Sequence, residues 1–374
     1  MPSSAQALQY MQQALDQALK ALYITSPNPR VGCVIVSPVG IVIGHGHTQI
    51  AGGPHAEVVA LENARSNGFD LKDATVYVTL EPCSHTGRTP PCSNALINAG
   101  VKRVVASLED PNPLVRGKGF AALRAAGIEV EVGLLAAESK HINEGFIKRM
   151  TASTPFVRLK IASSLDGATA LLNGKSKWIT GALARADGHA WRARSCAVLT
   201  GIGTLQSDNP TLNVRGIVTP RQPKAVVIDA QLDTPPDAAL FSESSREVLI
   251  YCAHAQSAKK AALTLRGATV IEMPGTKNSE HVDLKEMLRD LAQRQINELH
   301  IEAGAGLNAS FIKEDLVDEF LIYEAPIIVG PSKGWAQLSA LENLEDSSHL
   351  RFIESKLIGE DLFIRARRLN IHLS

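Results

Sequence analysis

The chain has 374 residues, enough for two or three domains of about 150 residues each. Hydrophobic residues make up 45% of the sequence and charged residues 20%, which excludes a disordered, collagen-like or low-complexity chain. Lys+Arg and Asp+Glu both number 38, so the chain has no basic bias, and we expect binding to neither nucleic acid nor a membrane.

The cysteines and the N-terminus indicate the compartment. Five cysteines are an odd number, which argues against a secreted disulfide framework. Residues 1–20 are amphipathic, with no basic region followed by an apolar run, so we expect no signal peptide. The uncharged stretch 31–56 is cut by Pro and Gly into apolar runs too short to span a bilayer. We therefore expect a cytoplasmic protein; the sequence leaves its oligomeric state open, a homo-oligomer included.

The first half reads as a regular alternation of elements. Apolar residues from Leu8 to Leu22 recur at helical spacing and predict an opening amphipathic helix. The predicted strands that follow are 31–36, 41–43, 75–80, 103–107 and 128–132, and the predicted helices are 55–66, 93–99 and 120–126. This order is typical of a three-layer α/β sandwich.

A second domain is expected after the break at Thr151–Pro155, which gives predicted domains of 1–148 and 153–374. Its predicted strands are 157–162, 197–200, 225–228, 248–251, 269–271, 299–302 and 320–323. Its predicted helices are 182–194, 284–295 and 307–313, and the stretch 350–371 alternates as a hairpin does. These patterns predict a second α/β domain with antiparallel strands at its end.

Four residues of the first half have the chemistry of a zinc hydrolase. His55, Cys83 and Cys92 supply one imidazole and two thiolates, a three-ligand set that leaves the fourth zinc position open for water. Zinc lowers the pKa of such a water, and Glu57, a carboxylate outside the ligand set, can move protons to the substrate and the leaving ammonia. The pattern resembles that of zinc nucleobase deaminases, except that eight residues (84–91) separate the cysteines instead of two.

Other interpretations of these residues stay open at this point. An isolated His-x-Glu is often solvated on a helix, and Cys83 and Cys92 alone could be core thiols or a structural zinc pair. Cys33, Cys196 and Cys252 lie in apolar strands and are interpreted as core residues. His47 either faces the substrate or has a structural role.

Two glycine-rich turns follow predicted strands in the second half. Residues 302–306 (Glu-Ala-Gly-Ala-Gly) precede a helix, so their backbone N–H groups could hold a phosphate; a plain turn is the alternative. Residues 200–204 (Thr-Gly-Ile-Gly-Thr) form the second turn. Neither has the G-x-G-x-x-G fingerprint, so we do not predict a Rossmann domain. Arg192 and Arg215 are candidate anion binders, although solvated surface arginines are the common case.

Several motifs together resemble the bifunctional riboflavin-biosynthesis deaminase–reductase family. In the first half they are Pro27–Gly32, Gly44–His47, His55–Glu57, Tyr77–Cys83, Ser84–Cys92 and Asp110–Pro113. In the second half they are Lys160–Gly167, Ser176–Thr180 and Asp208–Pro210, which are similar to the family's NADPH-dependent reductase domain. The resemblance implies an N-terminal cytidine-deaminase-like sandwich and a C-terminal dihydrofolate-reductase-like domain, both α/β.

The resemblance also implies site residues, position by position. Glu57 would be catalytic, and His55, Cys83 and Cys92 would bind one zinc ion per chain. The residues implied to contact NADPH are Ala162, Trp178, Thr204, Asp208, Gly304, Ala305, Gly306, Leu307, Asn308, Ala309 and Ser310. The residues implied to contact the substrate are Ser176, Arg192, Leu212, Arg215 and Glu302. Ala230 stands where a hydroxyl is expected near the nucleotide, and the proton donor for reduction, Asp208 or Lys160, stays open.

The expected function is therefore two consecutive reactions on one small-molecule skeleton. A zinc-dependent hydrolytic deamination of a phosphoribosylaminopyrimidine would be followed by NADPH-dependent reduction of its ribosyl group to ribityl. One alternative is deamination alone beside a degenerate reductase-like domain. Another is a zinc-stabilised nucleic-acid-binding module, against which the balanced charge and the aromatic content of 5% both argue.

Overall fold

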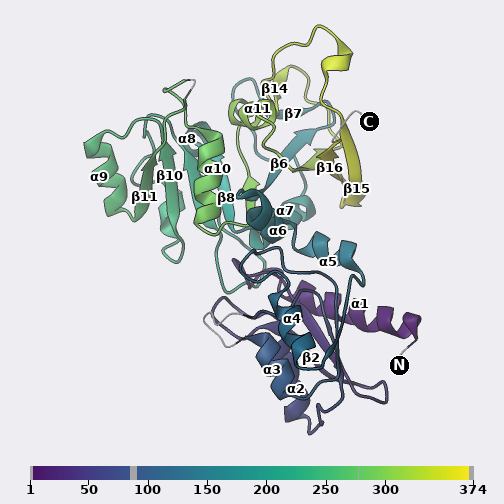
Figure 1. The fold of residues 1–374 in the computed structure, drawn as a ribbon. Coiled ribbons are helices and arrows are strands. Elements are labelled where there is room, and N and C mark those ends of the chain that lie inside the picture. The colour runs from purple at the N-terminus through teal and green to yellow at the C-terminus, as the bar shows by residue number, and fades with distance from the viewer. Residues whose placement is uncertain (1–2, 85–90, 277, 370–374) are drawn as a thin grey trace. The chain divides into compact units, whose positions relative to one another are not determined.

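The computed structural model describes residues 3–84, 91–276 and 278–369, which form two compact units, 1–154 and 155–374 (Figure 1). The inserted loop predicted between the cysteines falls largely on residues 85–90, outside the described residues, as does the end of the predicted hairpin beyond residue 369. No helix in the described ranges is long and apolar enough to cross a membrane.

The first unit is built around a five-stranded sheet. Its strands are β1 (Gly32–Val36), β2 (Val42–His47), β3 (Thr75–Val78), β4 (Arg103–Ala106) and β5 (Glu129–Val132), in the order β2-β1-β3-β4-β5. Its helices are α1 (Ser4–Lys20), α2 (Ala56–Ser66), α3 (Cys92–Asn98), α4 (Lys118–Ala125), α5 (Ala136–Ile142) and α6 (Glu144–Ala152). Strand β1 is antiparallel to both of its neighbours, whereas β3, β4 and β5 are parallel.

Alternation along β1 explains the layers of this unit. Cys33 and Ile35 pack into one buried cluster with α2, α3 and α4, whereas Val34 and Val36 pack into another with α1. Successive side chains of a strand point to opposite faces, so both faces of the sheet are covered by helices. The predicted three-layer sandwich is confirmed, and helices α5 and α6 are additions that the sequence pattern did not reveal.

The second predicted strand extends further than expected, to His47 instead of residue 43. A Cβ atom on Gly44 would lie 2.4 Å from the carbonyl oxygen of Ala60, and one on Gly46 would lie 2.5 Å from that of Ala56. These glycines do not end the strand; they allow it to pack directly against the backbone of α2. Gly44, taken from the sequence as the end of a short apolar run, therefore lies inside the strand.

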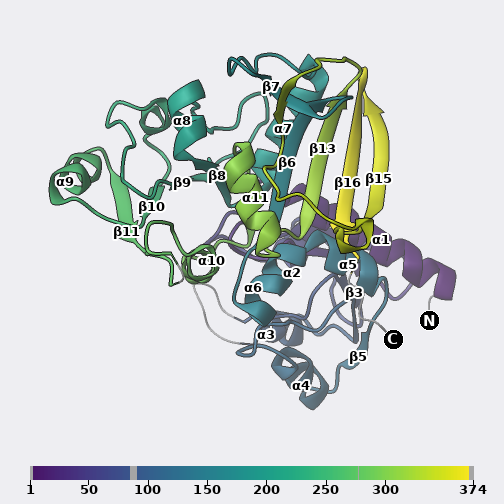
Figure 2. The same cartoon turned by 90° about the horizontal axis from the view of Figure 1, so that it is seen from above.

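The second unit contains a nine-stranded sheet in the order β11-β10-β9-β8-β12-β6-β13-β16-β15 and a two-stranded sheet, β14-β7. The large sheet consists of β6 (Phe156–Ser164), β8 (Ala197–Gly201), β9 (Lys224–Ile228), β10 (Val248–Cys252), β11 (Ala268–Glu272), β12 (Glu298–Ile301), β13 (Glu319–Ala325), β15 (Leu350–Ile358) and β16 (Asp361–Arg368). The small sheet consists of β7 (Ala168–Leu171) and β14 (Ser332–Gly334). Among the described strands of the large sheet, β16 alone runs antiparallel to its neighbours, β13 and β15, as the predicted C-terminal hairpin requires; Figure 2 shows β15 and β16 beside β13 and β6.

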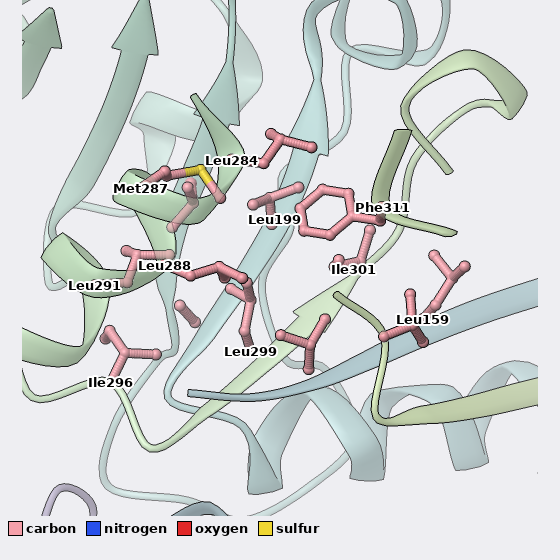
Figure 3. Packing of buried hydrophobic residues seen from close by; sticks show 14 of the residues in the cluster. Leu159, Leu199, Leu284, Met287, Leu288, Leu291, Ile296, Leu299, Ile301 and Phe311 are labelled. Carbon is pink, nitrogen blue, oxygen red and sulfur yellow. The ribbon is translucent and has the colours of Figure 1, made fainter. Parts of the chain in front are cut away.

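Helices cover both faces of the large sheet. They are α7 (Ala182–Arg194), α8 (Ile202–Asp208), α9 (Ser257–Leu265), α10 (Leu284–Gln293) and α11 (Ala305–Lys313), with short 3₁₀ turns at Ala239–Ser242 and Leu344–Asp346. Leucines and isoleucines of β6, β8 and β12 pack against α10 and α11 in the main core, as Figure 3 shows for Leu159, Leu199 and Ile301. On the opposite face, β6 presents Arg158 and Lys160 besides the apolar Phe156 and Ala162, and β12 presents Glu298 and His300.

Candidate functional site

Three metal-binding side chains converge in the first unit. His55 is the N-cap residue of α2, Cys83 follows β3, and Cys92 begins α3. Nδ1 of His55 lies 3.6 Å from Sγ of Cys83 and 3.4 Å from Sγ of Cys92. With Zn–N bonds of about 2.0 Å and Zn–S bonds of about 2.3 Å, a tetrahedral site separates N from S by about 3.5 Å. The predicted ligand set therefore fits zinc, and it is the one such donor cluster in the part of the chain that the structure describes.

The surroundings of Cys83 favour its thiolate. The side chain of Cys92, then that of His55, and then the backbone N–H of Cys92, which donates to Sγ of Cys83 at 3.3 Å, stabilise the negative charge. Burial opposes this, but the net result lowers the pKa of Cys83 to about 4. The thiolate is the form that binds a metal ion.

Glu57 lies beside the three ligands without being one of them. It occupies the first turn of α2, two residues after His55, and its side chain is only 3% exposed. Burial and the neighbouring charge of Cys83 raise its pKa to about 7. A carboxyl group with such a pKa can both accept and release a proton near neutrality.

A second buried carboxylate, Glu81, anchors the chain next to Cys83. Its oxygens accept hydrogen bonds from four backbone amides, those of Asp110, Gly117, Gly119 and Phe120, at 2.8–3.3 Å. A Cβ on Gly119 would lie 1.9 Å from the carbonyl oxygen of Pro82, so only glycine allows this close approach. Sequence reasoning placed Glu81 in a motif but gave it no role. Its partners are backbone amides, so no residue type in the sequence points to this role.

The remaining candidate residues of the first unit do not indicate a specific function. His47 is half-buried at the end of β2, where burial and nearby Lys20 lower its pKa. Cys33 is completely buried in the core, as predicted, and so are Cys196 and Cys252 in the second unit. All five cysteines are free thiols.

A cavity of about 1270 Å³ opens in the second unit. Its walls come from the α7 face of β6, from α7 itself, and from the segments that follow β8 and β12. Strands β8 and β12 are parallel neighbours, so the two glycine-rich turns predicted from the sequence lie at the same edge of the sheet. Ligands commonly bind at this carboxyl edge in α/β proteins.

The turn after β12 is suited to an anionic group. Gly304 is the N-cap residue of α11 and contributes no side-chain cap, so first-turn N–H groups are left for a ligand. Close packing explains a glycine in the other turn, because a Cβ on Gly201 would lie 3.0 Å from the side chain of Leu307. The turn after β8 therefore packs against the start of α11, which follows the other turn.

The cavity brings together nearly all residues that the sequence implied for cofactor and substrate. Every one of them lines it except Ala309, which is buried in α11. Ala230 lines the wall as well. Trp178 is 70% exposed and stacks under the guanidinium of Arg185 at 4.4 Å.

Charged groups at the floor of the cavity are paired with each other. Arg192 donates to both carboxylate oxygens of Glu302, at 2.5 and 2.8 Å, and to the backbone carbonyl of Asn213 at 3.0 Å. Burial opposes ionisation of Glu302, but Arg192 and His300 outweigh it and hold its pKa well below the usual range. Arg192 therefore orients Glu302, a role that sequence reasoning did not assign to it.

Other residues of the cavity were missed by sequence reasoning. Tyr323 on β13 donates to Asp187 on α7 at 2.5 Å, and its ring lies below Nζ of Lys160. His189 also lines the cavity, three residues before Arg192 on the same helix. Helical spacing places residues three apart on one face, so His189 could have been found from Arg192.

Comparison with known proteins covers both units. Residues 4–108 match the family described as the cytidine and deoxycytidylate deaminase zinc-binding region, and residues 155–364 match the RibD C-terminal domain. The riboflavin biosynthesis protein RibD of Haemophilus influenzae is 45% identical over 372 residues, covering 96% of each chain. That of Escherichia coli is 41% identical, over 94% of this chain and 97% of the relative.

Solved structures agree over nearly the whole length. The structure of Acinetobacter baumannii RibD is 40% identical with a TM-score of 0.89, covering 98% of this chain and 99% of its own. A diaminohydroxyphosphoribosylaminopyrimidine deaminase/5-amino-6-(5-phosphoribosylamino)uracil reductase from Thermotoga maritima is 32% identical with a TM-score of 0.84, at the same coverage. The predicted pair of folds, a deaminase-like sandwich and a reductase domain, is thereby confirmed.

Proposed function

Because this chain belongs to the RibD family, we propose specific roles for its residues in the two reactions of that family. The chain is a bifunctional enzyme of riboflavin biosynthesis, a deaminase and a reductase that act on a small molecule with zinc and NADPH as cofactors. We assign deamination to residues 1–148 and reduction to residues 153–374. The substrate is taken to be the diaminohydroxyphosphoribosylaminopyrimidine named for the Thermotoga maritima relative.

The convergence of His55, Cys83 and Cys92 beside Glu57 supports the deaminase assignment. Zinc held by these ligands supplies a Lewis acid that activates a water molecule. Glu57 would take one proton from the attacking water and give it to the ring nitrogen, and would then carry the second proton, from the hydroxyl group now on that carbon, to the departing amino group, which leaves as ammonia. The carbon–nitrogen bond breaks and a carbonyl group takes its place. Burial of Glu57 keeps bulk water from exchanging these protons.

The cavity supports the reductase assignment. The first-turn amides of α11 would hold the phosphates of NADPH, while Glu302, oriented by Arg192, would contact the sugar. NADPH held there would supply a hydride to the first sugar carbon; the bond from that carbon to the ring oxygen would break, and this oxygen would take a proton. The ribosylamino group thus becomes ribitylamino, and NADPH becomes NADP⁺.

The observation that supports the assignment is that the residues proposed for each of the two sites come together within one chain. Purified protein is incubated with the pyrimidine substrate, with and without NADPH, and the products are resolved by mass. We expect the deaminated ribosyl compound without NADPH and the ribityl compound with it. Ammonia release without any oxidation of NADPH would support the alternative, a deaminase with a degenerate second domain.

A cytoplasmic location is part of the proposal, since Cys83 and Cys92 can bind zinc only as free thiolates, which a reducing compartment preserves. The oligomeric state, including a homo-oligomer, is left to measurement.

A further inference from the structure

His189 stands in the cavity wall next to residues assigned to the substrate. It is half-buried on α7, and it shares one face of that helix with Arg192, three residues later. Both side chains line the cavity. No step proposed above uses His189.

The segment 211–215 is fastened to α7 at two points. The backbone N–H of Arg215 donates to Nδ1 of His189 at 3.2 Å, and Arg192 donates to the carbonyl of Asn213 at 3.0 Å. Arg215 in turn donates from its guanidinium to Thr211 Oγ1 at 3.2 Å and to Asn213 Oδ1 at 3.1 Å. Leu212 within this segment has a φ of +53°, a conformation that an L-residue adopts only when its surroundings hold it. His189 is therefore one of the fixed points that place Arg215.

The bond to Arg215 determines where the ring of His189 carries its proton. A backbone N–H can only donate, so Nδ1 must be the accepting, unprotonated nitrogen. In a neutral imidazole the proton is then on Nε2, which becomes a hydrogen-bond donor. Among the described residues, the bond from Arg215 is the hydrogen bond of normal geometry that the ring makes, and the backbone of Asn213 lies near enough to favour the protonated ring slightly.

The neighbouring charges keep this ring neutral. Burial, followed by the charges of Arg192 and Arg215, lowers the pKa of His189 to about 4, against a smaller opposing effect of Glu302 and the Asn213 backbone. A protonated ring would lose its acceptor and release the backbone of Arg215. At neutral pH the residue therefore combines one acceptor, used by the loop, with one donor, left for a ligand.

The charge balance identifies the ligand chemistry. Arg192 and Glu302 neutralise each other as a bidentate pair, so the exposed guanidinium of Arg215 and the buried Lys160 beside that pair are the remaining cations here. A positive guanidinium next to a neutral N–H donor is suited to a phosphate monoester. We propose that His189 is a substrate-binding residue, donating from Nε2 to the phosphate end of the sugar-phosphate substrate while its Nδ1 holds Arg215 in place. This inference rests on the reductase function proposed above.

Two variants separate the two contacts. In His189→Asn, the amide oxygen replaces Nδ1 as acceptor for Arg215, but no donor remains at the Nε2 position. In His189→Gln, an amide nitrogen reaches the Nε2 position, but the acceptor is displaced. The readouts are KM and kcat for NADPH oxidation with the deaminated intermediate and with its dephosphorylated form. The affinity for NADPH shows that the cavity is folded, and His254→Asn, a surface histidine of the same unit, is the matched control.

We expect His189→Asn to raise KM for the phosphorylated substrate roughly 10- to 100-fold, the usual effect of losing a hydrogen bond to a charged group. KM for the dephosphorylated form and the affinity for NADPH should stay within about twofold. His189→Gln should keep more of the preference for the phosphorylated substrate. An unchanged KM in His189→Asn, or an equal loss with both substrates, would overturn the proposal.

The wild-type protein provides a test that does not depend on folding of the variants. In a ¹⁵N spectrum of the histidine rings, His189 should be the Nε2–H tautomer, and its Nε2 resonance should shift when the ribityl phosphate product is added. An Nδ1–H tautomer, or no shift at saturation, would refute the inference alone. Absence of NADPH oxidation by the wild-type enzyme would instead refute the reductase function, and the role of His189 with it.

Discussion

The zinc site and the reductase cavity are assembled from the sequence in different ways. All the zinc ligands and Glu57 lie between residues 55 and 92, at the starts of two helices and after one strand. The cavity draws on residues from Lys160 to Gln337, contributed by strands, helices and the turns between them. A site made of adjacent element ends appears as a motif in the sequence, whereas a site made of one face of a large sheet does not.

The two regions also handle charge differently. In the zinc site, neighbouring donors favour a thiolate that a metal ion then neutralises. In the cavity, Arg192 and Glu302 neutralise each other before any ligand arrives. Loss of the metal should therefore impair only the first site. Loss of one cavity residue should reduce ligand binding in the cavity without abolishing it.

Removal of zinc should give the largest effect and the sharpest contrast between the regions. Cys83→Ser removes one of three ligands, so we expect weak metal retention and no deamination, with reduction of the deaminated intermediate unchanged. Metal analysis of untagged protein should find about one zinc per chain in the wild type. Full deamination by protein treated with a chelator and shown to be metal-free would refute the zinc assignment.

Glu57→Gln should separate proton transfer from metal binding. The variant keeps the size of the side chain but cannot exchange a proton, which typically costs 10²- to 10⁴-fold in rate. We expect a loss of that order in the deamination rate, with zinc still bound. A rate near that of the wild type would remove Glu57 from the mechanism.

Arg215→Ala is the matching change in the cavity. Loss of a charged hydrogen bond to the substrate should cost about 1.5–3 kcal/mol, or roughly 10- to 150-fold in apparent affinity. The apparent affinity for the deaminated intermediate, measured by NADPH oxidation, should fall by that factor. The rate of ammonia release from the first substrate should stay within about twofold of the wild type. Each activity is assayed with its own purified substrate. If deamination were lost and reduction persisted, the assignment of the reactions to the two units would be wrong.

The smallest effect concerns stability in acid. Burial would raise the pKa of Glu319, but Arg158, Arg365 and Arg367 outweigh it and lower the pKa to about 2. A carboxylate with a lowered pKa stabilises the fold above its ordinary pKa of 4.5, and this contribution is lost as the pH falls towards 2.

Between pH 5 and pH 3 we therefore expect a loss of about 2 kcal/mol in the free energy of unfolding of the second unit. The three tryptophans, Trp178, Trp191 and Trp335, all lie in that unit, so urea unfolding followed by their fluorescence measures it alone. The same free energy at both pH values would contradict the effect of the arginines on Glu319.

Strand and helix patterns predicted the fold class because both units are regular alternations with buried apolar faces. Short helices escaped prediction, among them α5, α6, α8 and α9. Helix α8, for instance, has a single buried leucine, Leu205, so it has no apolar periodicity to detect. The small strands β7 and β14 were missed for a similar reason, since only Ala168 of β7 is buried.

The sequence predicted the two candidate sites in different detail. The three side chains proposed as zinc ligands could be grouped from the sequence, and the structure brings them together, because residue type and spacing express the chemistry directly. The bidentate bond between Arg192 and Glu302 could not be predicted, because 110 residues separate them in the sequence. The four amides that bind Glu81 were equally invisible, since backbone groups leave no trace in residue identity.

Strand β12 contributes to the main core on one face of the sheet and leads to the cavity on the other. Leu299 and Ile301 face the main core, whereas Glu302, which follows the strand, lines the cavity, and the buried His300 lies next to its carboxylate. A shift of one residue in a strand exchanges its two faces. Deleting one residue within β12 would therefore turn a carboxylate towards the core and a leucine towards the cavity in the same variant. Such deletion variants should lose both expression and reductase activity. This strand should therefore tolerate substitutions but not a change of length.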